Sequence, residues 1–243
     1  MSFDHVGESN ENNSVQLRGI ANTRLDTFVD AAFAFGATVL LISSGDLPST
    51  YGELVALLKD IPAFVLSFFT MMIFWLSHRS WSQYYGLEDK VTIPLTLLLV
   101  VSLLVYIYPL KLMYSTLLTF MSNGYFPSGI SITSQAEGVS IIGFYGFGFA
   151  LLSVSMLGLY WRTYAVRNTM TLTDTECINA RIGMATWGLL VLIPLLSGFV
   201  ALVSPVRYGV WAGMIYLLIP AIMPLLIART KKRFEKEKEK PLV

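Results

Sequence analysis

The chain has 243 residues, 54% of them hydrophobic and only 14% charged, with a net charge of +1 and a mean hydropathy of +0.61. An average soluble domain carries about 25% charged residues, so this composition excludes an ordinary soluble protein. The single cysteine, Cys177, excludes an internal disulfide and a multi-cysteine metal site.

The N-terminal segment is polar. It contains no apolar stretch ahead of a small-residue cleavage site, so no signal peptide is expected. Residues 1–22 are therefore predicted to form a mobile cytoplasmic tail.

Six segments after this tail are candidates for membrane-spanning helices, because about 20 apolar residues cross a bilayer core as a helix. The first, Ala31–Gly45, is long enough only if the helix also includes the charged turns of residues 24–30. The other five are uncharged and lie at Ile61–Ser77, Val91–Leu110, Gly138–Trp161, Ile182–Val206 and Tyr208–Ala228. These runs do not alternate as β-barrel strands do. The predicted fold class is all-α, an integral membrane six-helix bundle over residues 23–229.

Three segments outside the apolar runs carry further signals. Residues 48–60 are a candidate for a small outer helix between the first two spans. Thr173 and Glu176 form a capping-box pattern, which predicts that the fifth helix starts ahead of its apolar run. Residues 230–243 form a predicted basic cytoplasmic tail, for which an anchor to anionic lipid is favoured over a partner-binding role.

The distribution of basic residues predicts the orientation. With the N-terminus inside, fourteen of the 17 Lys and Arg residues fall on the cytoplasmic side, and only Lys59, Lys111 and Arg207 fall outside. Basic residues are enriched in cytoplasmic loops. We therefore expect a multi-pass protein of the cell (plasma) membrane with both termini in the cytoplasm.

Ionisable residues within membrane spans are costly and mark candidate functional positions. They concentrate in Arg24–Asp30, at the inner end of the first span, and in Phe74–Trp81, at the inner end of the second. Both segments lie at the same depth, so Asp30 is expected to meet His78 or an Arg24. One interpretation is a polar cluster that pins the two helices together, and the other is a proton relay.

These two segments resemble the signature of the transmembrane protein 175 family, which comprises the endolysosomal potassium channel and its bacterial relatives. The first segment resembles the family's RxxxFSD motif and the Ala-rich stretch after it, and the second resembles the Trp and His of the family's second helix. The matching positions are Arg24, Phe28, Asp30, Ala34, Thr38, Trp75 and His78. The other four spans agree with the family in layout alone.

The resemblance implies a passive, potassium-preferring cation channel that needs no cofactor and is not an enzyme. In this family the first helices of symmetric subunits line the pore, and rings of apolar side chains form its constriction. The corresponding pore residues here are Phe35, Thr38, Val39 and Ile42, with Phe28 on the same face. No TVGYG-like loop supports a carbonyl filter. Without the resemblance, this stripe would be assigned to helix packing or lipid contact.

The resemblance also implies the partners. A single helix cannot enclose a pore, so the chain is expected to form a homotetramer around its first helix. Potassium ions and the lipid bilayer are its other expected partners, without a bound metal or nucleic acid. Arg24, Phe28, Asp30, Trp75 and His78 are assigned to a structural polar network.

Two positions depart from the family pattern, and one residue lies beyond it. Val29 replaces a serine, which removes a hydroxyl from the polar network. Phe35 replaces a smaller aliphatic residue at the narrowest ring, where its larger side chain can plug the conduit. Asp46 lies at the expected outer mouth, where four copies would raise the local cation concentration. Helix capping explains a single Asp equally well.

A secondary transporter of a small cation or solute is the main alternative, but the chain shows no matching pair of Gly- or Pro-broken segments in two halves. A membrane-embedded enzyme would need a metal or nucleophile constellation, which two histidines and one cysteine do not supply.

Overall fold

The computed structural model describes residues 17–19, 21–43, 47–204, 212, 215–216 and 218–238, and within these ranges the regular structure is helical. The six α-helices are α1 (Arg24–Ile42), α2 (Tyr51–Tyr85), α3 (Thr92–Met121), α4 (Gln135–Ala165), α5 (Asp174–Val203) and α7 (Leu218–Lys238). Five of these, α1 to α5, are long and apolar enough to cross a membrane. The all-α prediction is confirmed.

Side-chain caps explain where several helices begin. α1 starts at a capping box, because the Thr23 hydroxyl accepts from the Asp26 N–H at 3.0 Å and the Asp26 carboxylate accepts from the Thr23 N–H at 3.3 Å. The predicted capping box of Thr173 and Glu176 is present at the start of α5. α2 ends at Gly86, which adopts the left-handed conformation that favours glycine (φ 55°).

Two helices are longer than the sequence predicted. α2 is continuous over 35 residues, so the candidate outer helix at residues 48–60 is largely the first part of α2. α3 continues past Leu110 to Met121 and includes Lys111. The Lys111 ammonium lies 2.7 Å from the Asp60 carboxylate of α2, and both groups are mostly buried. This ion pair offsets the cost of burying a charge just past the apolar run that predicted the third span.

The sixth predicted span, Tyr208–Ala228, is not one continuous helix in the described residues. Ala212 and Ile215–Tyr216 lie in 3₁₀ turns, and α7 starts only at Leu218. Pro220 falls in the first turn of α7, where a missing N–H costs no helical hydrogen bond. α7 then continues through Arg229 into the predicted tail and ends at Lys238.

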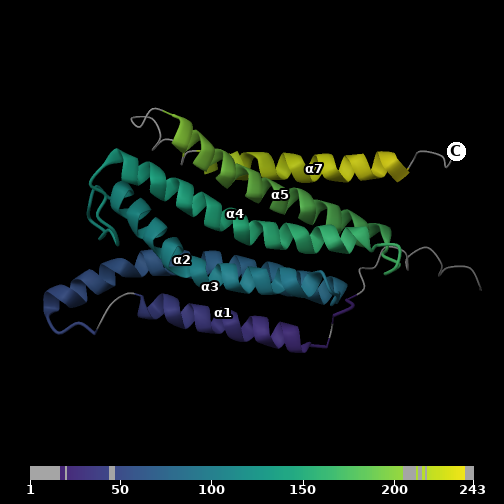
Figure 1. Cartoon of the computed structure of the whole chain (residues 1–243), viewed down its shortest axis with the longest axis horizontal. Coiled ribbons are helices and arrows are strands. Elements are labelled where there is room, and N and C mark those ends of the chain that lie inside the picture. The colour runs from purple at the N-terminus through teal and green to yellow at the C-terminus, as the bar shows by residue number, and fades with distance from the viewer. Residues whose placement is uncertain are drawn as a thin grey trace, which may run out of the picture.

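The helices are arranged in series, with α1 at one edge of the bundle and α7 at the other (Figure 1). α1 packs on α2 and α3, α3 packs on α4, α4 on α5, and α5 on α7. Among the described helices α1 contacts no other element. We call the end where α1 begins, α2 ends and α5 begins the basic end, and the other the opposite end.

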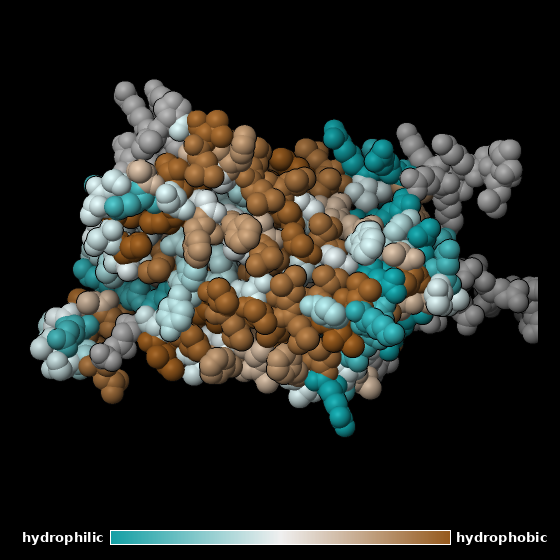
Figure 2. Space-filling model, in the orientation of Figure 1, coloured by the Kyte–Doolittle hydropathy of each residue, from teal (hydrophilic) through white to brown (hydrophobic). Residues whose placement is uncertain are grey.

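The surface agrees with a membrane protein. Figure 2 shows a broad hydrophobic belt across the middle of the bundle, with hydrophilic residues gathered toward the two ends. Large apolar side chains of the spans are exposed, among them Val105 of α3 (69% exposed) and Phe199 of α5 (63%). Such exposure of large apolar side chains is expected where lipid replaces water as the solvent.

The core lies between α2, α3, α4 and α5, and small residues bring these helices close together. The ring of Tyr106 (α3) lies against Gly148 (α4), and that of Tyr160 (α4) against Gly183 (α5). A Cβ at either glycine would lie less than 2.5 Å from the ring. Glycines allow this approach in many membrane helix pairs.

Candidate functional site

One face of α1 packs into the protomer. Val29, Phe33, Gly36 and Leu40 are buried and recur every three or four residues. Gly36 lies close to Ile107 of α3, because a Cβ at this position would lie 3.0 Å from the end of the Ile107 side chain. Val29, which replaces the serine of the family pattern, lies on this packing face and is 1% exposed. Its valine side chain therefore serves apolar packing.

The other face of α1 is uncovered in the protomer. Phe28 (50% exposed), Phe35 (61%) and Ile42 (66%) lie along it with the exposed Ala31 and Thr38. These five residues, which we call the exposed stripe, follow a spacing of three and four and so share one side of the helix. The Thr38 hydroxyl donates to the Ala34 carbonyl at 3.1 Å and remains exposed.

Two of the candidate pore positions differ from the rest of the stripe. Val39 is half-buried, so it lies at the border between the stripe and the packing face. Asp46, the candidate for the outer mouth, lies outside the described residues. The stripe of the protomer is therefore centred on Phe35 and Thr38.

Asp30 and Trp75 connect α1 to α2 at the basic end. The Trp75 indole N–H donates to the Asp30 carboxylate at 2.7 Å, and the Arg79 guanidinium lies 5.2 Å from the centre of the Trp75 ring. One turn earlier on α1, the Asp26 carboxylate accepts from the Ser82 hydroxyl at 2.7 Å. Both carboxylates line a small polar cavity of about 160 Å³ between the two helices.

His78 has a different partner from the one the sequence suggested. Its Nε2 lies 3.2 Å from the Thr96 hydroxyl of α3, and the imidazole is buried. His78 lines the cavity near Asp30 but is not its hydrogen-bond partner, because the helical turn directs Trp75 toward α1 and His78 toward α3. Arg24 is exposed and forms no ion pair with the described residues of its own chain. The expectation that Asp30 meets His78 or Arg24 is thus wrong within the protomer.

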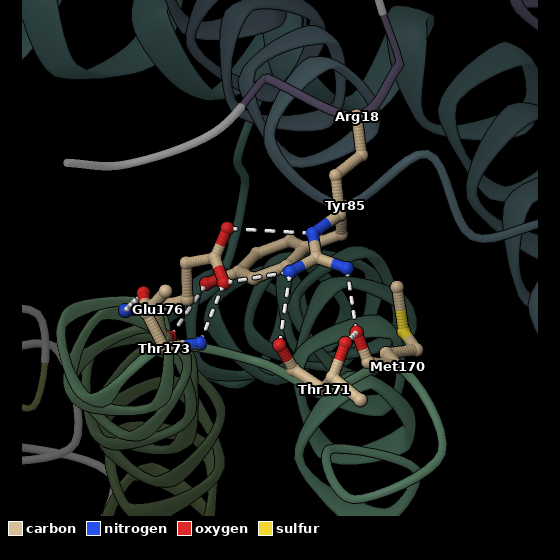
Figure 3. A network of polar contacts seen from close by, with 6 residues as sticks. All are labelled: Arg18, Tyr85, Met170, Thr171, Thr173 and Glu176. Carbon is tan, nitrogen blue, oxygen red and sulfur yellow. Dashed lines mark hydrogen bonds and ion pairs between the residues drawn. The ribbon is translucent and has the colours of Figure 1, made fainter. Parts of the chain in front are cut away.

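A second polar network joins the segment before α1 to the turn between α4 and α5 (Figure 3). The Arg18 guanidinium donates to the carbonyls of Met170 (2.6 Å) and Thr171 (3.2 Å). It also forms an ion pair with Glu176, with 3.0 Å between Nη2 and Oε2. Tyr85, at the end of α2, donates its hydroxyl to the Glu176 carbonyl at 3.2 Å.

Sequence reasoning missed this network. The Thr173–Glu176 capping pattern was visible, but no local signal indicates that the N3 carboxylate also binds an arginine 158 residues away. Arg18 falls within the segment predicted to be a mobile tail, whereas the structure gives it defined contacts.

A third polar contact at the basic end joins the α2–α3 loop to α4. The Arg162 guanidinium binds the Asp89 carboxylate at 2.7 Å. Burial alone would raise the pKa of Asp89, but hydrogen bonds from the Thr92 and Val91 N–H groups and from Arg162 outweigh it and lower the pKa to about 2. Asp89 therefore remains ionised at neutral pH.

The described residues contain no group of three or more His, Cys, Asp and Glu side chains that could hold a metal ion. At the opposite end, a cavity of about 500 Å³ lies between α1, α2, α3 and the loop around Gly129, beside the pair of Asp60 and Lys111. The residues around this cavity do not form the nucleophile, base and orienting group of a catalytic centre.

Comparison with known proteins assigns the family. A "Potassium channel" of Marivirga tractuosa is 32% identical over 234 residues, which cover 91% of this chain and 93% of that protein. The chain belongs to the TMEM175 family. The family model described as "Endosomal/lysosomal potassium channel TMEM175" matches residues 24–108, the segment that carries the exposed stripe and the Asp30–Trp75 contact.

A solved TMEM175 structure has the same fold. It is a crystal structure of a variant of the potassium channel MtTMEM175 in complex with a Nanobody-MBP fusion protein. Its TM-score is 0.81 at 28% sequence identity, and the match covers 90% of this chain and 98% of that one. The TMEM175 resemblance seen in two short motifs therefore extends over all the packed helices.

Proposed function

We propose that this TMEM175 protein is a potassium-preferring channel that assembles as a homotetramer with α1 around its axis. The observation that carries the proposal is the exposed stripe on a helix that, among the described helices, packs on α2 and α3 alone. Phe28, Phe35 and Ile42 are at least half exposed, and the polar Thr38 lies among them. Because this stripe includes a hydroxyl and lies at the edge of the bundle, it suits a water-facing pore lining better than plain lipid contact.

More than one subunit is needed to enclose an ion path. One α1 helix cannot surround an ion path, so several copies must place their stripes around a closed rotation axis. Fourfold symmetry is proposed by analogy with the family. In this arrangement each ring of the pore contains four identical side chains, and the rings from Phe28 to Ile42 follow each other along about 20 Å of helix.

The proposed constriction is the ring of Phe35. An apolar ring offers the ion nothing in place of its hydration water, so it opposes passage by width and by dewetting. Phe35 is 61% exposed in the protomer and so has the freedom to reach an axis. Thr38, one turn further along the stripe, provides four hydroxyls next to this ring, and Ile42 forms a second apolar ring.

The polar groups at the basic end are proposed to act in folding and assembly, not to bind the ion. Asp26 and Asp30 already accept hydrogen bonds from Ser82 and Trp75, and the His78 imidazole is buried against α3. An ion-binding carboxylate would instead be expected to point along the exposed stripe.

The proposed location is the cell membrane, with the basic end in the cytoplasm. Arg229, Lys231, Lys232 and Arg233 of α7 are exposed at this end. Basic residues at a membrane boundary favour the cytoplasmic side and anionic lipid headgroups.

The test is ion flux through purified protein in liposomes. A passive channel should carry potassium down its gradient without a coupled substrate, and sodium more slowly. Movement of potassium only together with a second solute or against its gradient would indicate a transporter instead.

A further inference from the structure

The stripe helix is isolated from half of the bundle. α1 packs on α2 and α3, and among the described helices it contacts none of α4, α5 and α7. Arg18 precedes α1 by six residues and reaches the α4–α5 turn. In the described part of the chain, Arg18 supplies all the hydrogen bonds seen between residues 17–43 and α4, α5 or their turn.

The backbone beside Arg18 packs closely against the end of α2. The Gly19 N–H donates to the Gln83 carbonyl at 3.0 Å, and a Cβ at Gly19 would lie 2.2 Å from the Ser82 carbonyl oxygen. Gly86, in its left-handed conformation, passes so close that a Cβ there would lie 3.0 Å from the Arg18 carbonyl oxygen. The segment is thus held between α2 on one side and the α4–α5 turn on the other.

All three nitrogen atoms of the Arg18 guanidinium donate hydrogen bonds. Nη1 and Nη2 bind the carbonyls of Met170 and Thr171 in the α4–α5 turn, while Nη2 and Nε bind the two oxygens of Glu176 at the start of α5 (Figure 3). The Glu176 side chain is 1% exposed, and its Oε2 also accepts from the Thr173 N–H at 2.8 Å. A lysine could not make all these contacts, because it carries one compact charge.

We propose that Arg18 is a positioning residue of the pore: together with Glu176 it forms a clasp that fixes the cytoplasmic end of α1 relative to α4 and α5. This inference rests on the proposed role of α1 as the pore lining. The stripe of α1 faces other copies of itself, so its placement depends on α2, α3 and this clasp. Displacement of the α4–α5 turn is transmitted to the pore entrance through Arg18.

Two substitutions break the clasp in different ways. Arg18→Ala removes the guanidinium. Glu176→Gln removes the charge but keeps the cap of α5, because glutamine also serves at this position of a capping box. Arg18→Lys keeps the charge without the fork. Arg229→Ala is the matched control, since it removes an exposed arginine of α7 at the same end of the bundle.

The first readout is potassium flux per assembled oligomer in liposomes. Arg18→Ala and Glu176→Gln should each lower the flux by roughly 2- to 30-fold, the range for residues that couple two elements. The double variant should be no worse than the more severe single one, Arg18→Lys should be intermediate, and Arg229→Ala should match the wild type. Wild-type flux in both Arg18→Ala and Glu176→Gln would overturn the proposal.

The second readout does not depend on conduction. Spin labels at Asn22 and Asn168, both exposed, report the distance between the start of α1 and the α4–α5 turn. They are placed on a Cys177→Ser background, and labelled chains are diluted with unlabelled ones. Arg18→Ala should broaden the distance distribution, and Arg229→Ala should not. If wild-type protein carries no potassium, the proposed function fails, and the clasp is then judged by this distribution alone: an unchanged distribution overturns it.

Discussion

The indole N–H of Trp75 donates to the Asp30 carboxylate at 2.7 Å and so joins the first and second helices at their basic ends. The Arg79 guanidinium lies over the same indole ring, 5.2 Å from its centre. The aromatic ring thus lies beside a carboxylate and a cation at once. This contact gives the carboxylate a hydrogen-bond donor, which lowers the cost of a charged group on a membrane helix.

Loss of this contact should weaken the packing of α1 on α2. Trp75→Phe leaves the Asp30 carboxylate without its donor, and a hydrogen bond to a charged group contributes about 1.5–3 kcal/mol. The melting temperature of the assembled protein should therefore fall. Trp161→Phe, at an exposed tryptophan of α4 (57% exposed), should leave the melting temperature unchanged.

Asp30→Asn should lower the yield of assembled oligomer before it alters ion selectivity. A normal oligomer with inverted ion selectivity would instead assign Asp30 to a direct ion site.

Cysteine cross-linking should detect the α1 axis in the assembly. On a Cys177→Ser background, Ile42→Cys should form disulfide-linked dimers under mild oxidation, because the stripes of neighbouring subunits converge. Leu97→Cys in α3 is the matched control, since it is also an exposed apolar residue of a span (41% exposed). Cross-linking at Leu97 without cross-linking at Ile42 would assign the axis to a different face.

The sequence predicted the spans and the helix start that depend on residues close together in the chain. Continuous apolar runs predicted the spans of α2 to α5, and a shorter run joined to the charged turns before it predicted α1. The Thr173–Glu176 pattern predicted the start of α5. The third span was predicted to end at Leu110, before the charged Lys111, whereas α3 continues past it and Lys111 pairs with Asp60 of α2. The pairing of Asp30 with Trp75 and the clasp of Arg18 depend on how separate helices pack, which one sequence does not encode locally.

The side chain of Phe35 should control conduction. Phe35→Ala widens and wets the proposed ring, so potassium current should rise and sodium should pass more readily. Phe35→Asn should also raise the current, because a polar side chain removes the dewetting barrier at a smaller change of width. Paired recordings in potassium and in sodium measure both effects. Unchanged currents in both variants would place Phe35 against lipid and move the constriction to Ile42.

Close contact between α3 and α4 depends on Gly148. A Cβ there would lie 2.4 Å from the Tyr106 ring, which cannot easily move because the Tyr106 hydroxyl donates to the Tyr145 carbonyl at 3.0 Å. Gly148→Ala should therefore destabilise the fold by about 1–3 kcal/mol, as overpacked cores do. Gly188→Ala in α5, where an added Cβ meets nothing within 4 Å, is the control and should be neutral or slightly stabilising. Equal melting temperatures for both variants would contradict the packing described here.

The contact of Asp89 with Arg162 should make the stability of the protein fall at low pH. The pKa of Asp89 is lowered from 3.8 to about 2, so its contribution is present above pH 3.8 and is lost as the pH falls toward 2. Asp89→Asn should lower the melting temperature at pH 5 and by much less at pH 2, where about half of the wild-type carboxyl is protonated. The effect should be modest, because both side chains are about a quarter exposed. A wild-type advantage as large at pH 2 as at pH 5 would argue against this carboxylate as its source.

Chemical modification of Thr38 tests the central claim most directly. Thr38→Cys on a Cys177→Ser background places a thiol on the stripe next to Phe35, and Leu97→Cys places one on α3. Single-channel recording before and after a charged methanethiosulfonate reagent reports whether each thiol faces the ion path. The α1-lined pore predicts that the reagent blocks potassium current in Thr38→Cys and leaves Leu97→Cys unaffected. Block of Leu97→Cys with unaltered current in Thr38→Cys would contradict it.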